Sequence, residues 1–133
     1  GNGLHGNAVD EKQESALFKT LRNFELTRHL IEKGADLNLK NRKQQTLLHM
    51  AVHHPVSIST LSLLLQKGAD PNVQNESGET PLILAILDSR TDAMELLIKA
   101  GAKLELQDRN HKTVLDYAEE KGYSLTRLRQ NGP

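Results

Sequence analysis

The chain contains 133 residues, with 17 basic side chains, 17 acidic side chains and no cysteine. This length predicts one domain with a buried core, and the cysteine count excludes disulfides and thiolate metal sites. A formal net charge of zero disfavours a dedicated nucleic-acid or membrane-surface binder, since such proteins usually carry an excess of basic residues. The longest apolar stretch, residues 81–87, is too short to span a bilayer.

Residues 1–12 are polar and rich in glycine and asparagine, and they lack the hydrophobic core of a signal peptide. We interpret them as a flexible N-terminal lead-in and expect a single folded domain over residues 13–133. The absence of cysteine is compatible with a reducing compartment, so we expect an intracellular protein of the cytoplasm or nucleus.

Two short markers recur along the chain with the same period. The first contains glycine followed by alanine and reads GADLN, GADPN and GAKLE at residues 34–38, 68–72 and 101–105. The second begins with threonine and reads TLLHMA, TPLILA and TVLDYA at residues 46–51, 80–85 and 113–118. Both markers step by 34 and then by 33 residues. The shared period predicts a stack of similar units, which we place at residues 13–40, 41–74, 75–107 and 108–130.

Each unit is predicted to contain two helices. A threonine side chain can cap a helix by accepting a hydrogen bond from a free backbone amide of the first turn. The threonines of the second marker therefore predict first helices at residues 47–53, 81–88 and 114–121. The second helices are predicted at residues 58–67, 91–100 and 124–130, and a glycine suited to a left-handed helix end follows the first two. Residues 13–38 supply a degenerate first pair, as terminal units often do. Polar segments between the units predict projecting turns.

These markers resemble the 33-residue period and the T-P-L-H-x-A motif of ankyrin repeats, and the resemblance covers residues 13–130. It implies an all-α fold, an ankyrin-repeat solenoid of stacked helix–turn–helix units with projecting turns. The chain departs from the family pattern in two turns, where Gln44 and His111 stand in place of the glycine found at position 78. We therefore expect these two turns to differ in conformation from the turn at Gly78.

Three histidines lie close together in the second unit, at positions 49, 53 and 54. Such a group could bind a metal or serve acid–base catalysis, but both roles need a further ligand or an acidic partner. The sequence places none, and no phosphate-loop, dinucleotide or nucleophile-elbow motif occurs. We therefore expect no catalytic residue, no cofactor and no metal. The resemblance implies that His49 forms hydrogen bonds near the motif threonine and to the adjacent repeat. Asp116 takes the same motif position in the fourth unit, where we expect it to hold a local cap or turn.

By resemblance, ankyrin repeats bind other proteins through the projecting turns and the exposed inner face of the first helices. The positions that match this surface are Arg42, Lys43, Gln45, His53, His54, Glu76, Ser77, Glu79, Leu87, Asp88, Arg109, Asn110, Lys112, Glu120 and Lys121. In the first unit, Thr20, Leu21 and Lys33 correspond.

Leu87 is the apolar centre of the binding surface that we hypothesise. The helix that contains it is apolar at nearly every position, which is more than one-sided burial requires. The charged residues around this centre form a basic patch, Arg42 and Lys43, and an acidic patch, Glu76, Glu79 and Asp88.

These features predict a non-catalytic module that binds a protein partner and is monomeric on its own. The alternative is an interaction or targeting fragment of a larger enzyme or effector whose catalytic part lies outside this chain. Nucleic-acid binding is disfavoured, because the net charge is zero and aromatic residues make up only 3% of the chain.

Overall fold

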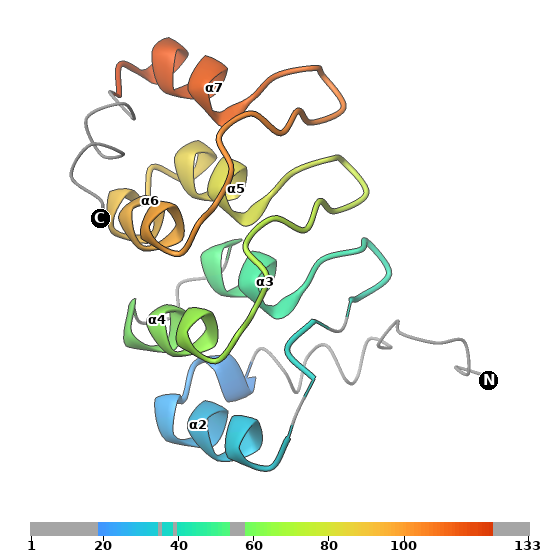
Figure 1. The fold of residues 1–133 in the computed structure, drawn as a ribbon, viewed down its shortest axis with the longest axis vertical. Helices are drawn as coiled ribbons and strands as arrows, with labels where there is room; N and C mark the ends of the chain where they lie inside the picture. Colours follow the sequence, from blue (N-terminus) through green and yellow to red (C-terminus); the bar gives the residue numbers. More distant parts are fainter. Residues whose placement is uncertain (1–18, 35, 39, 54–57, 124–133) are drawn as a thin grey trace.

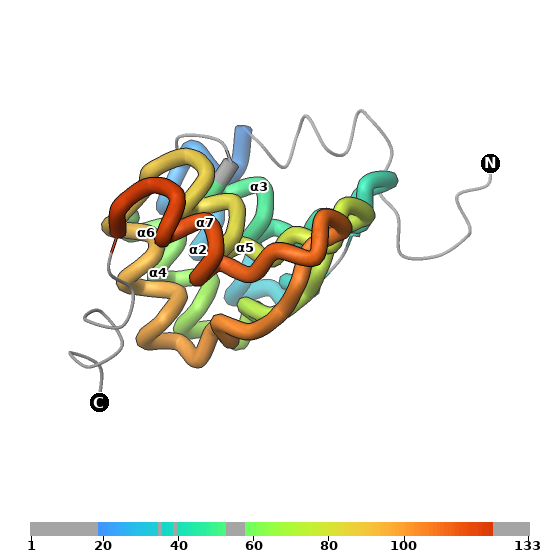
Figure 2. Tube along the Cα trace, turned by 90° about the horizontal axis from the view of Figure 1, so that it is seen from above, coloured from blue at the N-terminus to red at the C-terminus, as the bar shows by residue number. Residues whose placement is uncertain are grey.

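The computed structural model describes residues 19–34, 36–38, 40–53 and 58–123, without the side chain of His53. Its helices form two columns in one stack (Figure 1). One column contains the first helices of the repeats, α3 (Leu47–His53), α5 (Pro81–Leu87) and α7 (Val114–Lys121). The other contains the second helices, α2 (Phe24–Glu32), α4 (Ile58–Gln66) and α6 (Thr91–Lys99). Seen from above, the projecting turns of successive repeats lie over one another on one side (Figure 2).

The predicted helices agree with the structure to within one residue at each described end. Residues 19–21 are also helical, as expected for the degenerate first repeat. The helix predicted at residues 124–130 lies outside the described residues. Within the described ranges the regular elements are all helices, which confirms the all-α fold.

Threonine caps two of the first helices, as predicted. The Thr80 hydroxyl accepts a hydrogen bond from the backbone amide of Ile83 at 3.2 Å, and Pro81 occupies the first turn of α5, where no amide hydrogen is needed. Thr113 and Asp116 form a capping box, in which each side chain bonds the other's backbone amide. The cap expected at Asp116 is therefore present.

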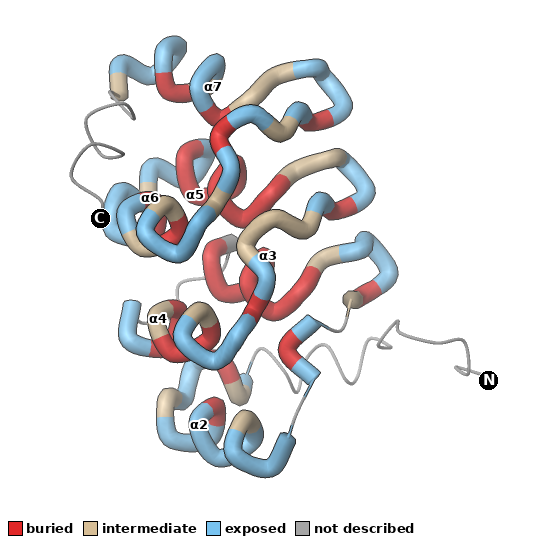
Figure 3. Tube along the Cα trace, in the orientation of Figure 1, coloured by how far each residue is buried: buried red, intermediate tan, exposed pale blue. Residues whose placement is uncertain are grey.

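The core lies between the two columns and between successive repeats. Buried residues run along α3 and α5 and along the sides of α4 and α6 that face them (Figure 3). The motif leucines Leu48 and Leu82 have no exposed surface, and Ile83 is 1% exposed. Burying a side chain of this size stabilises the fold by about 1.5–3 kcal/mol. The stack therefore depends on contacts between neighbouring repeats.

His49 links two repeats from a buried position. Its Nδ1 accepts from the backbone amide of Thr46 at 3.1 Å, so the ring proton lies on Nε2. Nε2 then donates to the carbonyl oxygen of Glu79 in the next repeat at 2.8 Å. Burial lowers the pKa of His49 from its ordinary value of 6.5, so the ring is neutral at pH 7. The structural role expected for His49 is confirmed.

A buried side chain holds the base of each projecting turn. Its Oδ1 accepts two backbone amides, from the residues two and four positions further along. The distances are 2.8 and 3.0 Å at Asn41, 2.9 and 2.9 Å at Asn75, and 2.8 and 3.1 Å at Asp108. Because buried amides need partners, these bonds determine the path of the turn. We call these three the turn-base residues.

The three turns share one conformation, so the difference expected at Gln44 and His111 was wrong. Gln44 has φ 64° and His111 has φ 61°, close to the φ of 75° at Gly78. This left-handed region costs a residue with a Cβ about 1–2 kcal/mol, and glycine avoids that cost. The turn-base hydrogen bonds impose the conformation whichever residue occupies the tip.

We expect glycine to stabilise the turn at position 44. Gln44→Gly removes the left-handed strain and should raise the free energy of unfolding by about 0.5–1 kcal/mol, net of the flexibility that glycine adds to the unfolded chain. The matched reverse change is Gly78→Ala, whose Cβ would lie 2.9 Å from the Cα of Asp108 and should destabilise the protein. Urea denaturation, monitored by the circular dichroism signal of the helices, measures the free energy of unfolding of both variants. Loss of stability in Gln44→Gly would contradict the shared conformation.

We also expect His49 to make stability depend on pH. Its pKa is lower in the folded chain than its ordinary 6.5, so the unfolded chain binds the proton more tightly. Its contribution is fully present above pH 6.5 and falls as the pH decreases, with a slope of at most about 1.4 kcal/mol per pH unit. The control is His49→Ile, which copies Ile83 and cannot titrate. Denaturation from about pH 7.5 to about pH 5 should give the wild type the steeper loss; equal slopes would refute this role.

Candidate partner-binding surface

Most of the residues predicted to contact a partner are exposed. The half-buried members of the predicted set are Gln45, Glu79 and Lys112. The exposed members are Arg42, Lys43, Glu76, Ser77, Leu87, Asp88, Arg109, Asn110, Glu120 and Lys121. The side chain of His53 and all of His54 lie outside the described residues.

The tips of neighbouring turns are bonded to each other through the backbone. The backbone amide of Glu76 donates to the carbonyl oxygen of Lys43 at 2.9 Å. One repeat further on, the backbone amide of Arg109 donates to the carbonyl oxygen of Ser77, also at 2.9 Å. Three turns from different repeats therefore form one row. Gly78 lies close to the neighbouring turn, since a Cβ there would meet the backbone of Asp108.

Charge changes sign along this row of turn tips. Arg42 and Lys43 are basic, Glu76 in the next tip is acidic, and Arg109 in the third is basic. Within the described part of the chain, these four side chains form no ion pair with one another or with any other group. They are charged groups on a rigid support, available to solvent and to a partner.

Two of the half-buried residues help to hold their own turns. The side-chain amide of Asn41 donates to Oε1 of Gln45 at 3.1 Å, and that of Asn75 donates to Oε1 of Glu79 at 3.2 Å. The same arrangement recurs one repeat apart, so Gln45 and Glu79 support the turn as well as border the surface.

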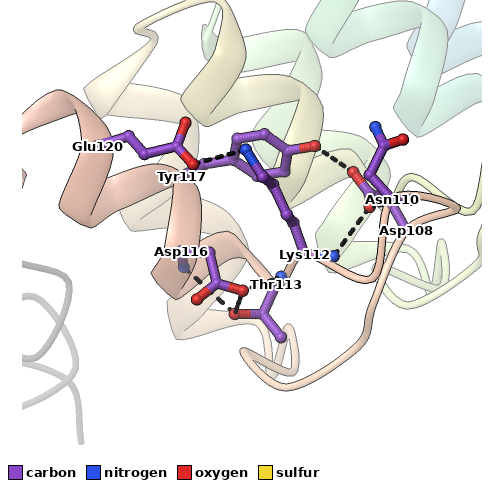
Figure 4. Close-up of polar contacts among 7 residues, drawn as sticks. All are labelled: Asp108, Asn110, Lys112, Thr113, Asp116, Tyr117 and Glu120. Carbon is purple, nitrogen blue, oxygen red and sulfur yellow. Dashed lines mark hydrogen bonds and ion pairs between the residues drawn. The ribbon is translucent and has the colours of Figure 1, made fainter.

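The turn of the fourth repeat, which is the third in the row, has additional contacts (Figure 4). Its turn-base residue is Asp108, whose Oδ2 accepts from the hydroxyl of Tyr117 on α7. The ammonium group of Lys112 lies 5.3 Å from the centre of the Tyr117 ring and donates to a Glu120 carboxylate oxygen at 2.6 Å. These contacts connect the turn to the middle of α7. Lys112 and Glu120, two members of the predicted set, therefore bind each other.

The pKa values in this cluster follow from its hydrogen bonds. The hydrogen bond to Asp108 and burial both raise the pKa of Tyr117. Burial also raises the pKa of Asp108, but hydrogen bonds from the Tyr117 hydroxyl and from turn amides outweigh it and hold that pKa below its ordinary value. The bond to Glu120 raises the pKa of Lys112. All three groups therefore keep their usual protonation states at pH 7.

Leu87 ends α5 and is 37% exposed. The chain turns directly after it, with Ser89 at φ 55°. Arg90 then reaches back to the end of α3, where its Nη1 donates to the carbonyl oxygen of Ala51 at 3.2 Å. This contact joins the segment between α5 and α6 to the C-terminal part of α3. The role of Arg90 was not predicted, because no local signal in the sequence places its guanidinium against the preceding repeat.

The first repeat does not match the predicted surface as expected. Leu21 is only 2% exposed and belongs to the core, so its assignment to the surface was wrong. Its neighbour Thr20 is half-buried, and its carbonyl oxygen accepts from the hydroxyl of Thr27 at 2.8 Å. The degenerate sequence of this repeat displaced the alignment. Lys33 is exposed.

No group of three or more histidine, cysteine, aspartate or glutamate side chains in the described residues could hold a metal ion. None of the helices described is long and apolar enough to cross a membrane.

Comparison with known proteins identifies the family of these repeats. A family model described as ankyrin repeats (3 copies) matches residues 2–75 and 48–129. A comparison with individual curated proteins gave no match. Ankyrin repeats are generally protein–protein interaction modules, and domains built from them are typically non-catalytic. The two matched segments cover most of the chain, which therefore belongs to the ankyrin-repeat family.

Proposed function

We propose that this chain binds a protein partner, without catalysis, through the row of turn tips and the adjoining ends of the first helices. The observation that carries this proposal is the row itself. Backbone hydrogen bonds of 2.9 Å join its three tips, and its charged side chains have no ion-pair partner within the described residues.

A rigid row of this kind lowers the cost of binding. Side chains and loops that order on association each reduce affinity, whereas a surface assembled during folding has already lost that freedom. The row presents positive, negative and positive charge in succession, at Arg42 with Lys43, at Glu76 and at Arg109. A complementary partner carries the opposite order of charges, and such matching favours the correct register and fast association.

Leu87 supplies the apolar contact of the proposed surface. Interfaces usually derive most of their affinity from a few buried apolar or aromatic side chains, surrounded by polar contacts that exclude water. Leu87 is exposed at the end of α5, and the exposed Asp88 follows it. A partner that covers Leu87 would also lie beside this carboxylate.

Leu87→Arg should abolish partner binding without unfolding the protein. Loss of an apolar hot spot costs about 2 kcal/mol or more, which is about a 30-fold loss of affinity. The matched control is Leu26→Arg, since Leu26 is 50% exposed on α2, in the column of second helices, and lies outside the proposed surface. The partner is identified by affinity capture with mass spectrometry, and its affinity and the melting temperature are measured for both variants. Wild-type affinity in Leu87→Arg would refute the apolar centre.

Reversing the middle charge of the row should slow association. Glu76→Lys makes all three tips basic, so we expect the association rate with the captured partner to fall about tenfold at low salt and to approach the wild-type rate at high salt. Glu105→Lys is the control, because Glu105 is also exposed but lies outside the row. Stopped-flow or surface-based kinetics at several salt concentrations measure the effect. An equal change in both variants would show that overall charge, and not the row, controls binding.

A further inference from the structure

Glu79 and Leu87 of the third repeat have direct counterparts in the fourth. One period of 33 residues relates Glu79 to Lys112 and Leu87 to Glu120. The backbone amides of Glu79 and Lys112 make the same bond, each to the side chain of its turn-base residue, at 2.9 and 3.1 Å. A threonine-capped helix follows in both repeats, α5 in one and α7 in the other. The side chains of Glu79 and Leu87 therefore start from positions that match those of Lys112 and Glu120.

The fourth repeat shows how a basic side chain lies across this surface (Figure 4). The ammonium nitrogen of Lys112 lies over the ring of Tyr117, 5.3 Å from its centre. The same nitrogen donates to a carboxylate oxygen of Glu120 at 2.6 Å. A long side chain can thus lie against an apolar or aromatic surface while its charged end bonds a carboxylate. In this repeat the chain supplies both charges itself.

The third repeat supplies only the carboxylate. Leu84 and Leu87 stand at the positions of Tyr117 and Glu120, so apolar side chains replace both the ring and the second charged group. Leu84 is 7% exposed, whereas Leu87 is 37% exposed. The result is an accessible apolar side chain beside the carboxylate of Glu79.

The carboxylate of Glu79 is bonded through one oxygen. Its Oε1 accepts from the side-chain amide of Asn75 at 3.2 Å. Its Oε2 makes no hydrogen bond or ion pair within the described residues. Lys112 on the next turn is already bonded to Glu120. Charges interact more strongly near a partly buried group than in bulk water, so a cation that reaches Oε2 is attracted to it.

The second repeat separates two roles of residue 79. Gln45 holds the corresponding position, and its Oε1 accepts from the side-chain amide of Asn41 at 3.1 Å. The acceptor for the turn-base amide is therefore common to both repeats. The negative charge is found only in the third, next to Leu87.

We propose that Leu87 and Glu79 together receive one basic side chain of the protein partner, a lysine or an arginine. Its methylene stem lies on Leu87, and its charged end bonds Oε2 of Glu79. This inference rests on the proposed function, since it names what the partner presents to the apolar centre of the surface. An apolar side chain would cover Leu87 but leave the carboxylate of Glu79 partly desolvated and without a counter-charge, which costs free energy. A basic side chain satisfies both groups at once.

Peptides selected on this surface test the proposal. Short random peptides displayed on phage are selected on the immobilised full chain, and those whose binding is lost in Leu87→Arg are retained. We expect the retained peptides to share a lysine or an arginine. Replacing that residue by norleucine keeps an apolar stem and removes the charge, so the affinity measured by fluorescence anisotropy should fall about tenfold.

Glu79→Gln assigns this loss to one carboxylate. The variant keeps the amide acceptor that Gln45 provides in the second repeat and removes only the charge, so the peptide and its norleucine form should bind it equally. Glu105→Gln is the matched control, because Glu105 is exposed and lies outside the row, and it should keep the difference of about tenfold. Melting temperatures check that both variants are folded.

The possible failures are distinguishable. Retained peptides without a basic residue, or a norleucine effect that persists in Glu79→Gln, would overturn this inference and leave the proposed partner surface intact. If no selected peptide depends on Leu87, both this inference and the proposed surface are overturned.

Discussion

The helices of this protein can bury their apolar sides only between neighbouring repeats. A pair of short helices is too small to enclose a core, so Leu48 and Leu82 become inaccessible only when the next repeat is in place. His49 follows the same constraint, because its Nε2 needs a carbonyl oxygen that the following repeat provides. Each repeat therefore takes part of its stability from its neighbours, and the described part of the chain behaves as one continuous core.

That constraint leaves the projecting turns on the surface, and we propose that they carry recognition. The turn-base residues hold each turn from within the repeat, and backbone bonds between the tips then join the turns into a row. Charges on the row are free of ion pairs in the described residues.

Local sequence predicted the helices well, because their signals lie within a few residues of each other. Thr80 and Thr113 bond amides three positions away, and both caps are present. Prediction failed at one turn tip and at one long-range contact. The tip at Gln44 was expected to differ from a glycine turn, but the turn-base hydrogen bonds impose the same left-handed conformation. Arg90 was missed because its acceptor lies on the preceding repeat.

The sequence by itself determined the family, the period, the helix positions and most of the exposed turn residues. These properties follow from caps and apolar spacing, which act over one or two helical turns. Only the tertiary structure decided three features. They are the hydrogen bonds between the turn tips, the burial of Leu21 and the recess beside the middle of α4. Each of these depends on how one repeat sits against another, and stacking brings together residues about one period apart.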